Sequence, residues 1–175
     1  MRHQHRITKY NPALRDASGA FTGDDWTACS DVGRAFGGVV LAQAAYQLVE
    51  DAYVFAVDSL LRAAGVDSLQ VRGLENRSNI KLLGFVKPGA DLNVAQCAEF
   101  ARIALRERAW GRLVAPGRAY VHFGYDYYMY IGLPRKCADT LDAVQQRGLF
   151  VEPFRSPYLR ANTVTAALHD HCCAS

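Results

Sequence analysis

The sequence has no hydrophobic run long enough to cross a membrane. Its longest apolar stretch falls well short of the roughly 20 residues that a spanning helix needs. Polar residues follow the opening Met-Arg-His-Gln-His-Arg, where a signal peptide would have an apolar segment. The five cysteines are odd in number and irregularly spaced, so they indicate free thiols and no disulfide framework. We therefore expect a soluble cytoplasmic chain with no membrane partner.

Common catalytic and cofactor motifs are also missing. The chain has no Gly-x-Ser-x-Gly elbow, no phosphate-binding loop and no dinucleotide-binding glycine motif. The stretch 169–173, His-Asp-His-Cys-Cys, holds metal-binding residue types. Structural zinc ligands usually come as separated pairs supported by further hydrogen bonds, and a chain end offers neither. We expect no cofactor and no functional metal site.

Charge is weak overall but uneven along the chain. The net charge of +3 over 175 residues does not indicate a nucleic-acid partner, whereas residues 11–60 carry two positive and seven negative side chains, a net −5. The negative charge of such a segment can attract a basic partner as the two proteins approach each other. The alternative is that these acids are ordinary solvated surface residues. Within it Asp24, Asp25 and Asp31 lie near Trp26, a composition typical of a binding hot spot. The alternative is structural, with Asp24 or Thr27 capping a short helical turn and Trp26 packing on the core.

Hydrophobic spacing predicts the fold. The expected elements are helices over 40–64, 93–110 and 134–148 and strands over 66–74, 80–86 and 149–154, preceded by a stretch that is mostly loop to about residue 38. The second helix has a capping box of Asn93 and Gln96. Helices and strands without strict βαβ repetition predict a single α+β domain over 1–159. It would contain a central mixed or antiparallel sheet, with about three helices packed mainly on one face. Residues 160–175 would form a flexible tail.

A conspicuous pattern spans residues 119–131, where two kinds of side chain alternate with a period of two. This period predicts one long strand. Its apolar face suits a core and carries Val121, Phe123, Tyr125, Tyr127, Met129 and Ile131. Its other face is aromatic with polar tips and carries Tyr120, His122, Asp126, Tyr128 and Tyr130. Tyrosines give large rigid contacts with a polar handle, so the second face suits recognition.

His122 and Asp126 would lie on that face about 13 Å apart by strand rise, which is too far for a direct dyad on a regular strand. A bulge at Gly124 could shorten the distance. No nucleophile motif accompanies them, so a contact or structural role is favoured over acid-base catalysis.

Four segments resemble a group of bacterial proteins that is similar to the immunity proteins of secreted polymorphic toxins. They are Tyr10-Asn-Pro-Ala-Leu-Arg-Asp-Ala-Ser-Gly-Ala-Phe, Asp24-Asp-Trp-Thr-Ala-Cys-Ser-Asp-Val-Gly, Val49-Glu-Asp-Ala-Tyr-Val and Tyr120-Val-His-Phe-Gly-Tyr-Asp-Tyr-Tyr-Met-Tyr-Ile-Gly. The resemblance spans residues 7–159 and carries no catalytic motif. It implies a cytosolic antidote that binds a secreted toxin domain and blocks its active site. It assigns no contact residues.

The first interpretation is thus a binding protein and not an enzyme. Its expected contact surface is Tyr120, His122, Asp126, Tyr128 and Tyr130, with Asp24, Asp25 and Asp31 aiding encounter. The alternative is a small hydrolase or modification-reversing enzyme that uses His122 with a carboxylate from the Asp24 loop. A third possibility, a nucleic-acid-binding module, would use Arg102, Arg106, Arg108 and Arg112 with the aromatic strand. An aspartate on the stacking face opposes it, because it repels phosphate.

Overall fold

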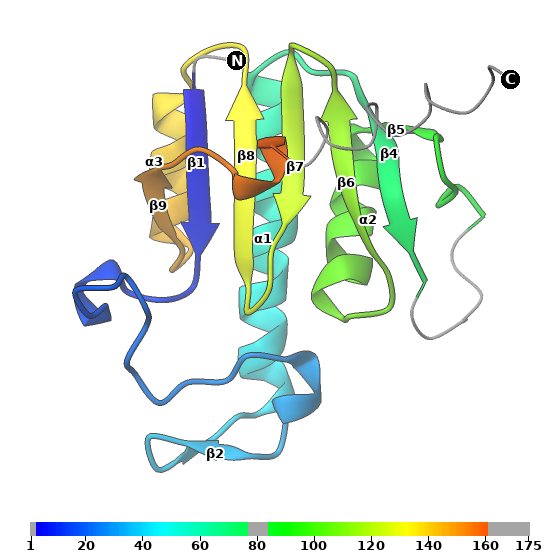
Figure 1. Ribbon diagram of the computed structural model, residues 1–175. Helices are drawn as coiled ribbons and strands as arrows, with labels where there is room; N and C mark the ends of the chain where they lie inside the picture. Colours follow the sequence, from blue (N-terminus) through cyan, green and yellow to red (C-terminus); the bar gives the residue numbers. More distant parts are fainter. Residues whose placement is uncertain (1–2, 77–83, 161–175) are drawn as a thin grey trace, which may run out of the picture.

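A seven-stranded antiparallel sheet runs through the protein, and three helices cover one of its faces (Figure 1). The computed structural model describes residues 3–76 and 84–160. The strand order is β5-β4-β6-β7-β8-β1-β9. The strands are β1 His3–Thr8, β4 Ser68–Glu75, β5 Asp91–Asn93, β6 Trp110–Ala115, β7 Ala119–Phe123, β8 Tyr128–Leu133 and β9 Phe150–Pro153. The predicted α+β fold, with helices on one face, is confirmed.

The helices are α1 Gln43–Ala63, α2 Val94–Leu105 and α3 Ala138–Gln146. A small separate hairpin pairs β2 Ala35–Phe36 with β3 Val39–Val40, and short 3-10 turns occur at η1 Pro12–Leu14, η2 Cys29–Asp31 and η3 Pro157–Arg160. In the part of the chain that the structure describes, no helix combines the length and hydropathy that crossing a membrane requires.

The capping box predicted for the second helix is present. The side chain of Asn93 accepts a hydrogen bond from the Gln96 amide at 2.9 Å, and the side chain of Gln96 accepts one from the Asn93 amide at 3.0 Å. These bonds satisfy two backbone donors that the first turn otherwise leaves unpaired. The helix ends at Leu105, earlier than predicted, because the chain then turns into β6.

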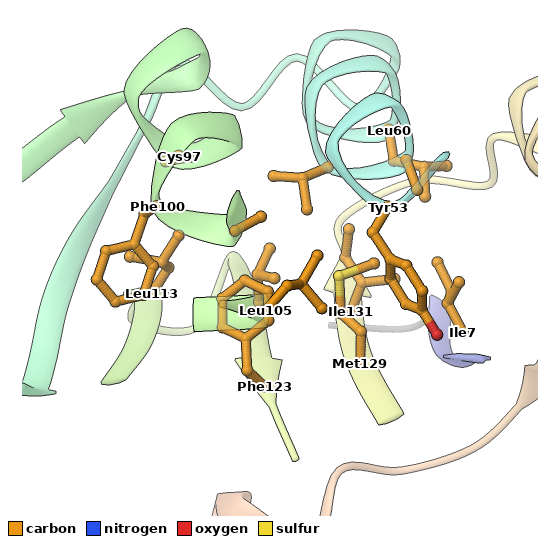
Figure 2. Close-up of a cluster of buried hydrophobic side chains, with 14 of the residues drawn as sticks. Ile7, Tyr53, Leu60, Cys97, Phe100, Leu105, Leu113, Phe123, Met129 and Ile131 are labelled. Atoms are coloured by element: carbon orange, nitrogen blue, oxygen red, sulfur yellow. The ribbon is translucent and has the colours of Figure 1, made fainter. Parts of the chain in front are cut away.

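The hydrophobic core lies between the helices and the sheet (Figure 2). Tyr53 and Leu60 from α1, Phe100 from α2, Leu113 from β6 and Ile131 from β8 are all fully buried. Burial of such side chains is the dominant stabilising contribution to a domain of this size. The sheet's other face lies toward the viewer in Figure 1, where the segment 154–160 crosses it in front of β1 and β8.

The prediction of one long strand over 119–131 is wrong, because the chain reverses between β7 and β8. Asp126 and Tyr127 have φ of 53° and 60°, and the Tyr128 amide bonds to the Tyr125 carbonyl at 3.1 Å. Positive φ at both central residues is the requirement of a type I′ hairpin turn. The predicted faces of the flanking residues survive, since Val121 pairs with Ile131 and so stays on the core side.

The sequence prediction also missed three strands of the seven-stranded sheet, together with the small β2–β3 hairpin. β1 was expected to be loop, yet it lies inside the sheet between β8 and β9. Its polar sequence fits there because Arg6, on the outer face, forms an ion pair with Glu152 of β9 at 3.1 Å. β5 is only three residues long, and most of β6 lies between the helix predicted over 93–110 and the strand predicted from residue 119, where the sequence analysis predicts no element. The strand predicted over 149–154 is confirmed as β9, at the edge of the sheet, where Pro153 is tolerated.

Two predictions lie wholly or partly outside the described residues. The strand expected over 80–86 includes the undescribed residues 80–83, and Gly84, Phe85 and Val86 are not in a strand. The tail over 160–175, with its His-Asp-His-Cys-Cys stretch, lies beyond them except for residue 160. Cys29, Cys97 and Cys137 are free thiols, as expected.

Candidate functional site

Tyr120 and His122, two residues of the predicted contact surface, lie beneath the segment 154–160. Their exposed fractions are 0% and 2%. The Tyr120 ring stacks on the His122 ring with a centroid distance of 4.4 Å, and it fills the space over Gly132 that a Cβ would need. His122 Nδ1 lies 2.8 Å from Ser156 Oγ. The exposed placement expected for these two residues is therefore wrong, because a non-local segment covers them.

Tyr130, a third residue of that surface, is also largely buried, at 9% exposed. Its ring lies 5.8 Å from that of Phe154 and 6.0 Å from that of Tyr158, measured between centroids. Burial, together with the positive charge of Arg112, lowers the pKa of the neighbouring His122 to about 4. The aromatic face of the sheet is thus mostly an internal packing surface.

The three acids expected to aid encounter have different environments. Asp31 is buried, and its carboxylate accepts hydrogen bonds from the Thr27 and Ala28 amides, each at 3.0 Å. Asp24 is exposed and accepts from the Gly37 amide at 2.7 Å. Asp25 is half-buried and forms a 2.6 Å ion pair with Lys9. Asp31 is therefore a structural cap and not a free surface charge.

Four of the predicted residues come together at one recess. This recess, which we call the loop pocket, has a volume of about 480 Å³. The predicted residues that line it are Asp25, Asp126, Tyr128 and Tyr130, joined by Arg6, Tyr10 and Phe21 among others. Arg6 is held there by Glu152 and lies over the Phe154 ring, 4.4 Å from its centroid. The structure thus brings the acidic loop and the aromatic strand together, as a binding site would require.

A second recess, the turn pocket, has a volume of about 350 Å³. Leu105, Phe123 and Met129 give it apolar lining, and Trp110, Tyr125, Tyr127, Glu107 and Asp126 complete most of its wall. Thr27, Asp126 and Tyr128 line both pockets. The β7–β8 turn, at the lower end of the sheet in Figure 1, therefore lies between the two recesses.

The turn pocket also concentrates the strained backbone of the protein. Among the described residues, the non-glycine residues with positive φ are Glu107 at 55°, Asp126 at 53° and Tyr127 at 60°. All three line this pocket. Left-handed backbone costs an L-residue about 1 kcal/mol or more, and a bulky residue rarely adopts it. Such residues cluster at ligand-binding sites. Their coincidence marks the turn pocket as the candidate functional site.

Buried polar contacts hold Tyr127 in its strained conformation. Its hydroxyl donates to the Leu105 carbonyl at 2.9 Å, and its ring packs edge-on against Trp26 with a centroid distance of 4.9 Å. The Tyr53 hydroxyl donates to the Tyr127 carbonyl. Burial raises the pKa of Tyr127, so its hydroxyl stays protonated and remains a donor. Trp26 thus has the structural role weighed from the sequence, and it braces the turn.

A buried carboxylate fixes the other wall of the turn pocket. Glu50 on α1 is fully buried and accepts from Arg106 at 2.6 and 2.8 Å, from Arg102 at 2.5 Å and from Tyr46 at 2.9 Å. The Tyr46 hydroxyl lies 3.3 Å from that of Tyr127. This cluster ties the end of α2 to α1 immediately before Glu107. It also engages two of the four arginines considered for a nucleic-acid surface.

Replacing Glu107 with glycine should raise the free energy of unfolding by about 1 kcal/mol, because glycine adopts positive φ without strain. Glu107 follows the end of α2 in a Schellman motif, with Arg108 N to Ile103 O at 3.1 Å and Glu107 N to Ala104 O at 3.0 Å. Urea unfolding measures the change. Arg108→Gly, one residue further, is the control and should give no gain. A less stable Glu107→Gly would show that the glutamate side chain stabilises the fold.

Sequence reasoning did not identify Glu107, Trp110 or Tyr125 as site residues. Tyr125 was assigned to the core face, whereas it is 70% exposed, because the turn interrupts the strand alternation. Gly124 followed closely by Asp126 could have indicated the turn, since both residue types tolerate unusual backbone conformations. Glu107 had no recognisable signal, since glycine is the residue expected at its position.

The arrangement is suited to binding. Two pockets with aromatic walls flank a rigid turn, and exposed carboxylates lie at Glu107 and Asp126. Within residues 3–76 and 84–160, no three His, Cys, Asp or Glu side chains converge as possible metal ligands. Comparison of the chain with protein-family models, with curated proteins and with solved structures finds no match.

Proposed function

We propose that the protein binds another protein through the end of the sheet at the β7–β8 turn. The partner is a secreted toxin domain, and binding neutralises it by occluding its active site, as the sequence resemblance implies. The observation that carries the proposal is the exposed aromatic ring of Tyr125 on a turn of strained residues between two pockets. A rigid aromatic anchor beside recesses is typical of an interface hot spot.

The rigidity of this end supports binding by a preformed surface. Tyr127 and Trp26 pack beneath the turn, and the Glu50 cluster fixes the helix end beside it. A surface that is already ordered loses little conformational entropy on association, so more of the contact energy appears as affinity. This is an advantage for an inhibitor that must bind its target tightly.

The enzyme alternative has one feature in its favour, the 2.8 Å separation of Ser156 Oγ and His122 Nδ1. A nucleophile and base lie at such a distance. Each of the two residues is only 2% exposed, however, and a substrate would have to displace the segment 154–160 to reach them. Asp24, the carboxylate considered for this site, is bonded to Gly37. Occlusion is therefore the preferred proposal.

Replacing Tyr125 with alanine should weaken partner binding by about 30-fold, the loss typical of a hot-spot residue near 2 kcal/mol. The protein is tagged, used to capture partners from its native lysate, and washed at high salt; the affinity of the captured protein is then measured. The Tyr125→Ala unfolding midpoint should not change, because the ring is mostly exposed. Leu48→Ala removes a side chain that is 73% exposed on α1 and should bind like the wild type.

Two outcomes would contradict the proposal: the wild type retains no protein, or Tyr125→Ala binds as tightly as Leu48→Ala. The mode of neutralisation is tested with the same partner. Occlusion requires an equimolar amount of this protein to abolish the partner's activity. An enzyme would act at a small fraction of that amount, and His122→Ala would abolish the effect.

A further inference from the structure

The turn pocket has the size and lining of a receptor for one side chain. Its volume of about 350 Å³ is near the lower end of the range for small-ligand sites. The lining residues Leu105, Phe123 and Met129 are all buried and apolar. They offer a contact surface for a methylene stem, as apolar surfaces do for long charged side chains.

The charge of this pocket is one-sided. The described residues that line it include two carboxylates, those of Glu107 and Asp126, but no lysine or arginine. Arg106 and Arg108 flank Glu107 in the sequence, but neither is among the residues that line the pocket, and the guanidinium of Arg106 is bonded to Glu50. The loop pocket differs, since Arg6 lines it together with its two acids. The turn pocket therefore favours a cation, and it would repel a carboxylate or phosphate.

Aromatic rings add a preference among cations. Trp110 and Tyr125 both line the pocket. The Trp110 indole is fixed by a hydrogen bond from Nε1 to the Phe123 carbonyl at 2.7 Å. A planar guanidinium stacks on such rings and presents several donors to carboxylates, whereas an ammonium is a compact point charge. This combination matches arginine better than lysine.

We propose that the turn pocket receives one arginine side chain of the partner protein. The stem would lie along Leu105 and Met129, and the guanidinium would lie against the aromatic wall near Glu107 and Asp126. This inference rests on the proposed function, and it specifies the chemistry that the partner presents. The carboxylates that attract the partner would then be those of Asp126 and Glu107, whereas the sequence analysis placed the attracting acids within residues 11–60.

The direct test uses the tripeptide Ac-Gly-Arg-Gly-NH2 and ¹⁵N-labelled protein. In an NMR titration, we expect chemical-shift changes that saturate at the Trp110 indole and the Gly124 amide. The Kd should be on the order of 1 mM, as suits a single side chain. The lysine peptide should bind more weakly, and the leucine and glutamate peptides should produce no saturable shift. Equal binding of the leucine peptide, or no saturable shift with the arginine peptide, would overturn the inference.

Charge-removing variants provide the matched controls. Glu107→Gln and Asp126→Asn keep the size of each side chain, and asparagine tolerates the positive φ at 126. Each should weaken the arginine peptide about 3-fold and both together about tenfold, as expected for exposed ion pairs. Asp91→Asn, an exposed acid on edge strand β5, should have no effect. Unchanged affinity in the double variant would also overturn the inference.

The same variants separate this inference from the proposed function. If the captured partner is lost with Tyr125→Ala but retained at full affinity by the double variant, the surface is correct and the arginine pocket is wrong. If the arginine peptide binds as described but the wild type captures no protein, the pocket is correct and the proposed function is wrong.

Discussion

Replacing Glu50 with alanine is expected to lower the free energy of unfolding by about 3 kcal/mol, because it leaves the charges of Arg102 and Arg106 without their buried partner. Glu50 itself is fully buried, and the two arginine side chains are 24% and 33% exposed. Burial would raise the pKa of Glu50, but hydrogen bonds from Arg106, Tyr46 and Arg102 outweigh it and leave the pKa below its usual value. The carboxylate is therefore ionised at neutral pH, and the Glu50→Ala substitution removes a negative charge.

The neighbouring residue Asp51 provides a matched control. It is on the same helix and pairs with the same Arg102 at 3.0 Å, but its side chain is 54% exposed. Asp51→Ala should change the free energy of unfolding by less than about 1 kcal/mol, as exposed ion pairs do. Urea unfolding at pH 7 measures both variants. A cost for Glu50→Ala no larger than that for Asp51→Ala would show that the buried cluster does not stabilise the helix pair.

Lowering the pH from 7 to 4 should destabilise the wild type by about 3 kcal/mol more than a His122→Gln variant. Burial, with the charge of Arg112, lowers the pKa of His122 to about 4 in the folded protein, against 6.5 in the unfolded chain. Between these values the unfolded chain binds more protons. The stability contributed by neutral His122 is thus complete above pH 6.5 and is lost as the pH falls through that range.

The comparison with His122→Gln isolates this contribution, because glutamine does not titrate and other acidic groups affect both proteins equally. The glutamine variant is expected to be less stable at pH 7 but to have the smaller pH dependence. Urea midpoints at pH 7, 6, 5 and 4 provide the curves. Parallel curves would mean that His122 protonates in the folded state without cost, and that the segment 154–160 does not exclude water from it.

The sequence correctly predicted the elements that depend on interactions between residues close together in the chain. The capping box at Asn93 placed the start of α2, and the spacing of apolar residues placed α1 and β9 to within a few residues. The alternation over 119–131 correctly separated core-facing Val121 from outer-facing His122. The residues of β7 and β8 share one period of two on either side of the turn, so the pattern did not reveal that the chain reverses between them.

The remaining features depend on contacts between distant segments. β1 lies inside the sheet, where Arg6 pairs with Glu152 of β9, and no periodicity in the sequence shows such a pairing. Tyr120 and His122 are buried by a segment more than thirty residues further along the chain. Of the candidate site, the sequence identified Asp126 and Tyr128, whose exposed or half-buried side chains line both pockets. It missed Glu107, because glutamate disfavours the positive φ that it adopts here, and local sequence preferences therefore predict a different residue at this position.

The most direct test of the binding surface is amide hydrogen exchange of the protein alone and in complex with its captured partner. We expect the partner to slow exchange at Glu107, Ala109, Trp110 and residues 124–128, which line the turn pocket, and to leave edge strand β5 unchanged. Slower exchange confined to another region, such as the β2–β3 hairpin, with no change at 124–128, would contradict the assignment of the partner to this end of the sheet.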